Sequence, residues 1–131
     1  MKCLLVDDEA LARDRLRRLL ASLRPELECL EAADAVSALE LAARERPEIA
    51  ILDIRMPGMD GLELASRLNE QAAPPAVLFS TAYDEYALDA LRRAAVGYLL
   101  KPVRAEELAG ALEQAARPNR AQLAVLRGEE A

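Results

Sequence analysis

The segment IAILDIRMPGMDG, residues 49–61, carries the clearest signal of the fold class. Its first four residues are apolar and predict a strand that is buried on both faces and stops at Asp53. Pro57 and Gly58 then predict a loop before the next helical pattern. Because fully apolar strands are typical of parallel sheets with both faces covered, this segment indicates an α/β protein.

The rest of the chain repeats this arrangement. Apolar runs predict strand cores at residues 3–6, 27–30, 49–52, 76–79 and 97–100. Apolar residues at helical spacing follow within 12–23, 38–43, 62–68, 87–91 and 108–115. Strands that alternate with helices predict five parallel strands joined by right-handed crossovers, with helices on both faces. The pattern fades after residue 116, so we expect one domain over 1–116 and a linker or tail over 117–131.

The charge of the chain restricts its partners and its chemistry. Seventeen basic and 23 acidic side chains give a net charge of −6, which disfavours direct binding of nucleic acid. The sequence contains no His, which excludes a Ser–His nucleophile pair and a phosphohistidine donor role. DNA contact, if the protein makes any, is therefore expected through another domain.

Two further features place the chain in a compartment. Cys3 and Cys29 lie inside apolar runs and are interpreted as two small buried hydrophobic residues rather than a redox or metal site. No apolar run approaches the roughly 20 residues that span a bilayer, and the N-terminus lacks the layout of a signal peptide. We therefore expect a cytoplasmic protein without a membrane partner.

Polar side chains stand at the ends of four predicted strands. Asp7 and Asp8 follow the first strand, Asp53 the third, a hydroxyl pair at 80–81 the fourth and Lys101 the fifth. Because ligands of open parallel sheets bind beyond the carboxyl ends of the strands, these groups are expected to converge. Three carboxylates repel one another when ionised, and a Mg²⁺ ion with oxygen ligands relieves that repulsion. The sequence thus favours a site for Mg²⁺ and a transferring phosphoryl group.

Each of these residues also has an ordinary structural interpretation. A single Asp at a strand end is usually a helix N-cap or a solvated turn residue, and Lys101 alone would be a surface lysine. The combination favours the phosphate and metal site, because all the polar strand ends suit one chemistry. A cis Lys101–Pro102 bond would direct the lysine side chain toward that site.

Four motifs together resemble the receiver domain of bacterial two-component response regulators, the CheY-like superfamily. They are VDDE at residues 6–9, LDIRMPGMDG at 52–61, STA at 80–82 and KP at 101–102. The resemblance covers residues 1 to about 116 and implies a flavodoxin-like sheet of order 2-1-3-4-5. It also implies phosphorylation by a sensor histidine kinase, with Mg²⁺ as the cofactor.

The resemblance implies a role for each residue of these motifs. Asp53 would be the phosphoacceptor and a metal ligand. The other metal-binding groups would be Asp8, the main-chain carbonyl of Arg55 and, through water, Asp7.

The remaining motif residues would bind the phosphoryl group or shape the site. Thr81 and Lys101 would contact the phosphoryl oxygens, and Tyr98 would be an aromatic switch residue. The residues expected to shape the loops are Pro57, Gly61 and Pro102.

Residues 81–88 and 97–102 further resemble the subgroup of receivers that precede a LytTR-type DNA-binding domain, the AlgR-like regulators. This resemblance implies a transcriptional output through a C-terminal effector domain. Phosphorylation would change a surface made by the fourth helix, fifth strand and fifth helix, through which two receivers would pair. The candidate contact residues are Asp89, Arg92, Arg93, Arg104 and Glu107, although a solvated charged face is the simpler interpretation.

Three other functions share part of this pattern. A phosphatase of the haloacid dehalogenase kind needs a second Asp two residues after the nucleophile, where this chain has Arg55. A flavin or nucleotide site would need a Gly-rich phosphate loop after the first strand, which is missing. A receiver that acts as a phosphorylation-independent interaction module stays open.

Overall fold

The computed structural model describes residues 1–82 and 97–116. Its strands are β1 (Lys2–Val6), β2 (Glu28–Ala32), β3 (Ile49–Asp53), β4 (Ala76–Thr81) and β5 (Gly97–Leu100). Its helices are α1 (Ala10–Leu23), α2 (Ala35–Glu45), α3 (Gly61–Asn69) and α5 (Ala105–Ala116). The predicted fourth helix, around residues 87–91, lies outside the described residues.

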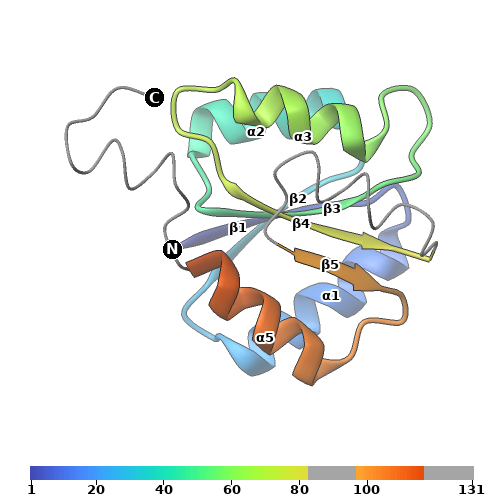
Figure 1. Cartoon of the computed structure of the whole chain (residues 1–131), viewed down its shortest axis with the longest axis vertical. Coiled ribbons are helices and arrows are strands. Elements are labelled where there is room, and N and C mark those ends of the chain that lie inside the picture. The colour runs from blue at the N-terminus through green and yellow to red at the C-terminus, as the bar shows by residue number, and fades with distance from the viewer. Residues whose placement is uncertain (83–96, 117–131) are drawn as a thin grey trace.

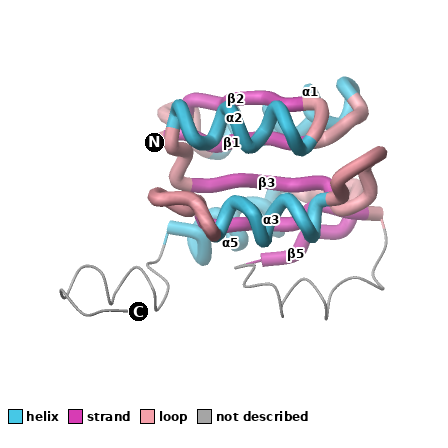
Figure 2. Tube along the Cα trace, turned by 90° about the horizontal axis from the view of Figure 1, so that it is seen from above, coloured by secondary structure: helices cyan, strands magenta, loops and turns pink. Residues whose placement is uncertain are grey.

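All five strands run parallel in the order β2-β1-β3-β4-β5, which confirms the predicted flavodoxin-like topology. Figure 1 shows α2 and α3 on one face of the sheet and α1 and α5 on the other. Seen from above, α2 runs along β1 and β2, and α3 runs alongside β3 (Figure 2). The sheet is therefore the middle of three layers.

The alternation of side chains along the strands creates two cores. In β1, Leu4 and Val6 pack in the core under α2 and α3, whereas Cys3 and Leu5 pack in the core with α1 and α5. Successive strand residues point to opposite faces, which is why an entirely apolar run suits this position. Cys29 is half-buried opposite Cys3 in the register, and both thiols are free.

Two of the helices that cover the sheet begin after an aspartate that caps their first turn. Asp34 caps α2 by accepting a hydrogen bond from the Ser37 amide at 2.8 Å. Asp60 caps α3 in the same way through the Glu63 amide at 2.9 Å. Within the described residues, no helix is long and apolar enough to cross a membrane.

The second strand differs from its prediction. Residues 27–30 were expected, but β2 is Glu28–Ala32. An apolar run is a poor guide here because β2 is the edge strand, where charged residues such as Glu28 and Glu31 stay exposed. The backbone pairing with β1, from Lys2 to Val6, sets the observed ends.

Candidate functional site

The sheet register brings the polar strand ends to one edge. Asp53 is the last residue of β3 and lies opposite Ser80 of β4. Thr81, the last residue of β4, pairs with Leu100, and its carbonyl accepts a hydrogen bond from the Lys101 amide at 2.8 Å. Parallel strands in this register therefore place the groups that follow β1, β3, β4 and β5 side by side, as the sequence predicted.

Three carboxylates form a cluster at this edge. Oxygen atoms of Asp7, Asp8 and Asp53 all lie within 4.8 Å of one another. Asp7 and Asp53 are each only 7% exposed, whereas Asp8 is exposed. Two buried acids and one open to solvent make a pocket of negative charge that a cation can enter from one side.

Lys101 neutralises part of this charge. Its Nζ atom lies 2.8 Å from Oδ2 of Asp7 and 3.5 Å from Oδ1 of Asp53. The Lys101–Pro102 peptide bond is cis, and Pro102 itself is exposed. The ammonium group thus contacts both buried acids of the cluster.

The environment shifts the pKa values of these groups. Burial, and then the negative charge of Asp7, raise the pKa of Asp53 to about 6 in spite of the opposing Lys101 cation. Burial acts to lower the pKa of Lys101, but its hydrogen bond to Asp7 and the Asp53 charge outweigh this effect and raise it. At neutral pH the site therefore holds an ammonium ion beside a carboxylate whose ionised form is disfavoured.

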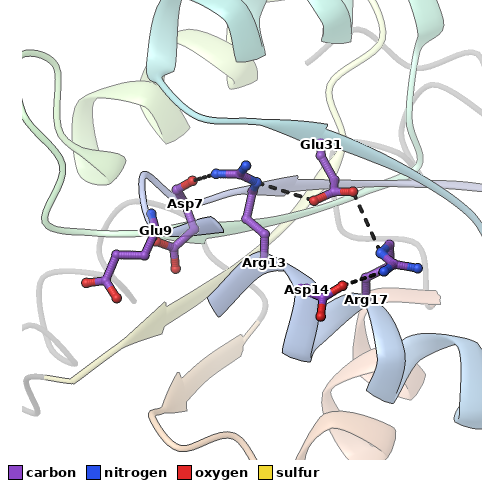
Figure 3. Close-up of polar contacts among 6 residues, drawn as sticks. All are labelled: Asp7, Glu9, Arg13, Asp14, Arg17 and Glu31. Carbon is purple, nitrogen blue, oxygen red and sulfur yellow. Dashed lines mark hydrogen bonds and ion pairs between the residues drawn. The ribbon is translucent and has the colours of Figure 1, made fainter. Parts of the chain in front are cut away.

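Every polar group of Asp7 has a partner. Its amide donates to the Ala32 carbonyl at 3.2 Å, and its Oδ1 accepts the Glu9 amide at 2.9 Å. Its carbonyl accepts a hydrogen bond from Nη1 of Arg13 at 2.5 Å, as Figure 3 shows. The sequence prediction did not place Arg13 at the site, because one arginine among several on the first helix carries no pattern that sets it apart from a solvated charge. In the structure its side chain is half-buried.

The loop after Asp53 is shaped at the predicted glycine. A Cβ atom added to Gly61 would lie 2.1 Å from the Asp53 carbonyl oxygen. The Gly61 amide also donates to the Ile54 carbonyl at 2.8 Å, which closes the loop. Arg55 and Pro57 are exposed and line an open hollow together with Asp8.

Two other predicted residues lie on β4 and β5, Thr81 at the end of β4 and Tyr98 near the start of β5. Thr81 is completely buried, next in sequence to the residue that pairs with Asp53. Tyr98 lies opposite Phe79 in the sheet and is half-buried against the core under α2 and α3. The structure therefore brings Asp7, Asp8, Asp53 and Lys101 within contact distance, and places Tyr98 on β5, next to β4.

A cavity adjoins the acid cluster on its α1 side. It has a volume of about 310 Å³, and its lining includes Asp7, Asp53 and Lys101 together with apolar residues of α1.

Comparison with known proteins agrees with this arrangement. The response regulator receiver domain pattern matches residues 3–113 of the chain. The chain belongs to the response regulator receiver domain family. This receiver domain therefore comes from a two-component response regulator.

Curated relatives resemble the receiver domain over almost its whole length. The positive alginate biosynthesis regulatory protein of Pseudomonas aeruginosa is 56% identical over 128 residues, which cover 96% of this chain and 51% of that protein. The sensory transduction protein LytT of Bacillus subtilis is 39% identical, covering 92% of this chain and 50% of that protein. The chain spans about half the length of these relatives.

Solved structures share the fold. The signal receiver domain of the putative response regulator NarL from Mycobacterium tuberculosis has a TM-score of 0.78 and 36% identity, covering 88% of this chain and 97% of that one. A putative response regulator from Chloroflexus aurantiacus has a TM-score of 0.81 and 26% identity, covering 88% and 98%.

Proposed function

We propose that this receiver domain accepts a phosphoryl group on Asp53 from a partner histidine kinase. One observation carries the proposal: three carboxylates lie within 4.8 Å of one another, and the Lys101 ammonium contacts two of them. Phosphoryl transfer depends on positioned cations that stabilise charge on the equatorial phosphoryl oxygens. A nucleophilic carboxylate beside a fixed cation suits that reaction.

The acid cluster fits a Mg²⁺ ion. Two direct ligands of one Mg²⁺ ion stand at most about 4.2 Å apart, since each lies near 2.1 Å from the metal. A cluster within 4.8 Å therefore suits a mixture of direct and water-mediated ligands. We assign Asp8, Asp53 and the Arg55 carbonyl as the direct ligands, and Asp7 as the acceptor for metal-bound water. When bound, Mg²⁺ would supply positive charge that offsets the carboxylates and the phosphoryl oxygens.

The residues of the chain divide the work of the transfer. A carboxylate oxygen of Asp53 attacks the phosphorus atom of a phosphohistidine, a P–O bond forms, and the P–N bond breaks with its electron pair left on the imidazole. Lys101 turns from the acids to the phosphoryl oxygens, and the Thr81 hydroxyl donates a hydrogen bond to one of them. Tyr98 on β5, the proposed aromatic switch residue, then changes its side-chain position in response. In this mechanism the domain is the phosphoacceptor rather than an enzyme with its own substrate.

Intact-mass spectrometry tests the proposal directly. The wild type, Asp53→Asn and Asp60→Asn are each incubated with acetyl phosphate, with Mg²⁺ or with EDTA. We expect one added phosphoryl group on the wild type with Mg²⁺, and none on Asp53→Asn or in EDTA. Asp60→Asn is the matched control because it removes an acid from the same loop, and asparagine also caps helices well.

The same measurement distinguishes a phosphoacceptor from a receiver that acts without phosphorylation. A folded wild type that gains no phosphoryl group from acetyl phosphate or from a kinase donor would contradict the proposal. The domain would then be a phosphorylation-independent interaction module. An adduct that persists in Asp53→Asn would move the acceptor to another residue.

We further propose that the receiver controls a LytTR-type DNA-binding domain. Support comes from the similarity to LytT and to the alginate regulatory protein, and from the coverage of about half of each. On this proposal residues 1–116 form the receiver and 117–131 lead toward an effector domain. The proposed output surface comprises β5, α5 and the helix predicted around residues 87–91, which lies outside the described residues. Arg104, just before α5, and Glu107 are exposed candidates for pairing two receivers. Asp89, Arg92 and Arg93 lie outside the described residues.

A further inference from the structure

The main-chain carbonyl of Asp7 is held by a side chain from the first helix. Nη1 of Arg13 donates to this oxygen at 2.5 Å, from a side chain that is only 17% exposed. Hydrogen bonds from a charged donor are roughly twice as strong as neutral ones. The carbonyl belongs to the planar peptide unit between Asp7 and Asp8. The bond therefore fixes the orientation of the peptide that joins two acids of the cluster.

Arg13 is itself held from the opposite side. Its Nε atom lies 3.3 Å from Oε1 of Glu31 on β2, so the guanidinium bridges the end of β1 and the neighbouring strand (Figure 3). The second Glu31 oxygen lies 3.8 Å from Nε of Arg17, which also pairs with Asp14. A planar guanidinium with two fixed acceptors has little freedom to leave the carbonyl.

The two contacts of Arg13 have different consequences. The Glu31 ion pair is partly exposed, with 39% of the Glu31 side chain open to solvent, so by itself it contributes little to stability. The carbonyl contact acts on a residue that is 7% exposed and that is otherwise held at its amide and at both carboxylate oxygens. The effect of Arg13 is therefore expected at the acid cluster more than in the overall stability.

We propose that Arg13, oriented by Glu31, is a positioning residue that presets the Asp7–Asp8 backbone for binding the divalent cation. This inference rests on the proposed function, since it concerns the same Mg²⁺ site. Asp8 is exposed and follows directly from the fixed peptide, so the orientation of that peptide sets the Asp8 Cα position from which its carboxylate reaches the cluster with Asp53. Mutation of a residue that orients metal ligands typically lowers metal affinity tenfold to a hundredfold.

The test compares Mg²⁺ affinity with stability. Isothermal titration calorimetry gives the Mg²⁺ dissociation constant, and thermal unfolding in EDTA reports stability without the metal. We expect Arg13→Ala to weaken Mg²⁺ binding about tenfold. Arg13→Lys keeps the charge but loses the planar fork, so it should recover less than half of that loss on a logarithmic scale. Glu31→Gln should weaken binding about twofold to threefold, because the anchor loses its charge.

Arg18→Ala is the matched control. It removes the same charge from the same helix, but Arg18 is 77% exposed and pairs with Asp14, away from the acids. We expect its Mg²⁺ dissociation constant to equal that of the wild type. If Arg13→Ala fails to fold, Arg13→Lys and Glu31→Gln carry the test.

The outcomes separate this inference from the proposed function. A wild-type Mg²⁺ affinity in Arg13→Ala, with only a lower unfolding temperature in EDTA, would show a purely structural role and overturn the inference. Full recovery of the Mg²⁺ affinity in Arg13→Lys would overturn the positioning role, because charge alone would then explain the effect of Arg13. Absence of Mg²⁺ binding in the folded wild type would contradict the proposed function, and this inference with it.

Discussion

At the scale of single residues, Asp53 stands under opposed demands. It is almost completely buried beside a second acid, which disfavours its ionised form. The proposed role as a nucleophile requires that ionised form at neutral pH. Lys101 only partly offsets the free-energy cost of ionising Asp53, because its ammonium group also pairs with Asp7. The site therefore carries an electrostatic imbalance that the proposed Mg²⁺ ion would relieve.

This imbalance predicts a pH-dependent gain in stability for Asp53→Asn in EDTA. The pKa of Asp53 is raised from 3.8 to about 6, so between these values the folded state binds more protons than the unfolded state. The free energy of unfolding then falls as pH rises through this window, and the full penalty remains above it. We expect Asp53→Asn to be more stable than the wild type by about 1–3 kcal/mol at pH 7.5. The difference should shrink toward pH 4.

Urea unfolding at pH 4, 5, 6 and 7.5 measures this difference, and Asp60→Asn again serves as the control. Addition of Mg²⁺ at neutral pH should stabilise the wild type by mass action and leave Asp53→Asn nearly unchanged. Parallel pH profiles for the wild type and Asp53→Asn would contradict the assigned electrostatic cost.

At the scale of elements, the β3–α3 loop is defined by a close backbone approach. A side chain at Gly61 would meet the Asp53 carbonyl at 2.1 Å and Ile54 Cα at 2.8 Å, and neither backbone atom can rotate away. Asp60 caps α3 immediately before this glycine. The start of α3 and the position of Asp53 are therefore coupled through one residue without a Cβ.

A pair of glycine substitutions tests this coupling. Gly61→Ala should lower the free energy of unfolding by about 2–3 kcal/mol and reduce phosphorylation of Asp53, because the loop must move. Gly110→Ala is the control, since a Cβ there meets nothing within 4 Å and the residue lies inside α5. It should raise stability by about 0.5–1 kcal/mol through helix propensity. Chemical denaturation and intact mass give both quantities, and equal effects at the two sites would refute the steric account.

At the scale of the whole molecule, the family match ends at residue 113 and the last described helix ends at Ala116. The two cores are closed by α5 on one face and by α2 and α3 on the other. The described contacts that build the acid cluster come from residues between 7 and 101.

A chain shortened to residues 1–116 should therefore behave as the full chain does. We expect its thermal midpoint to stay within about 2 °C of the full-length value and its Mg²⁺ affinity to be unchanged. Differential scanning calorimetry and calorimetric titration compare the two proteins. A large loss of stability would mean that residues 117–131 belong to the folded domain.

The sequence determined the sheet and the composition of the acid cluster. Entirely apolar strand cores and strand-end acids are local signals, because burial on two faces and the carboxyl-end rule act on each strand separately. The same reasoning gave wrong ends for β2. This edge strand contains exposed charged residues, so an apolar run does not mark its length.

Only the tertiary structure decided how the acids are held. The 2.8 Å contact of Lys101 with Asp7 joins residues 94 positions apart, and the Arg13 bridge depends on the side-by-side pairing of β1 and β2. Neither contact has a local sequence pattern, because its partners are far apart in the sequence. From sequence alone, an arginine on a helix is interpreted as a solvated charge, and only the position of the neighbouring strand shows its partner. The sequence named the groups that carry the chemistry, and the packing of separate strands and helices set their distances.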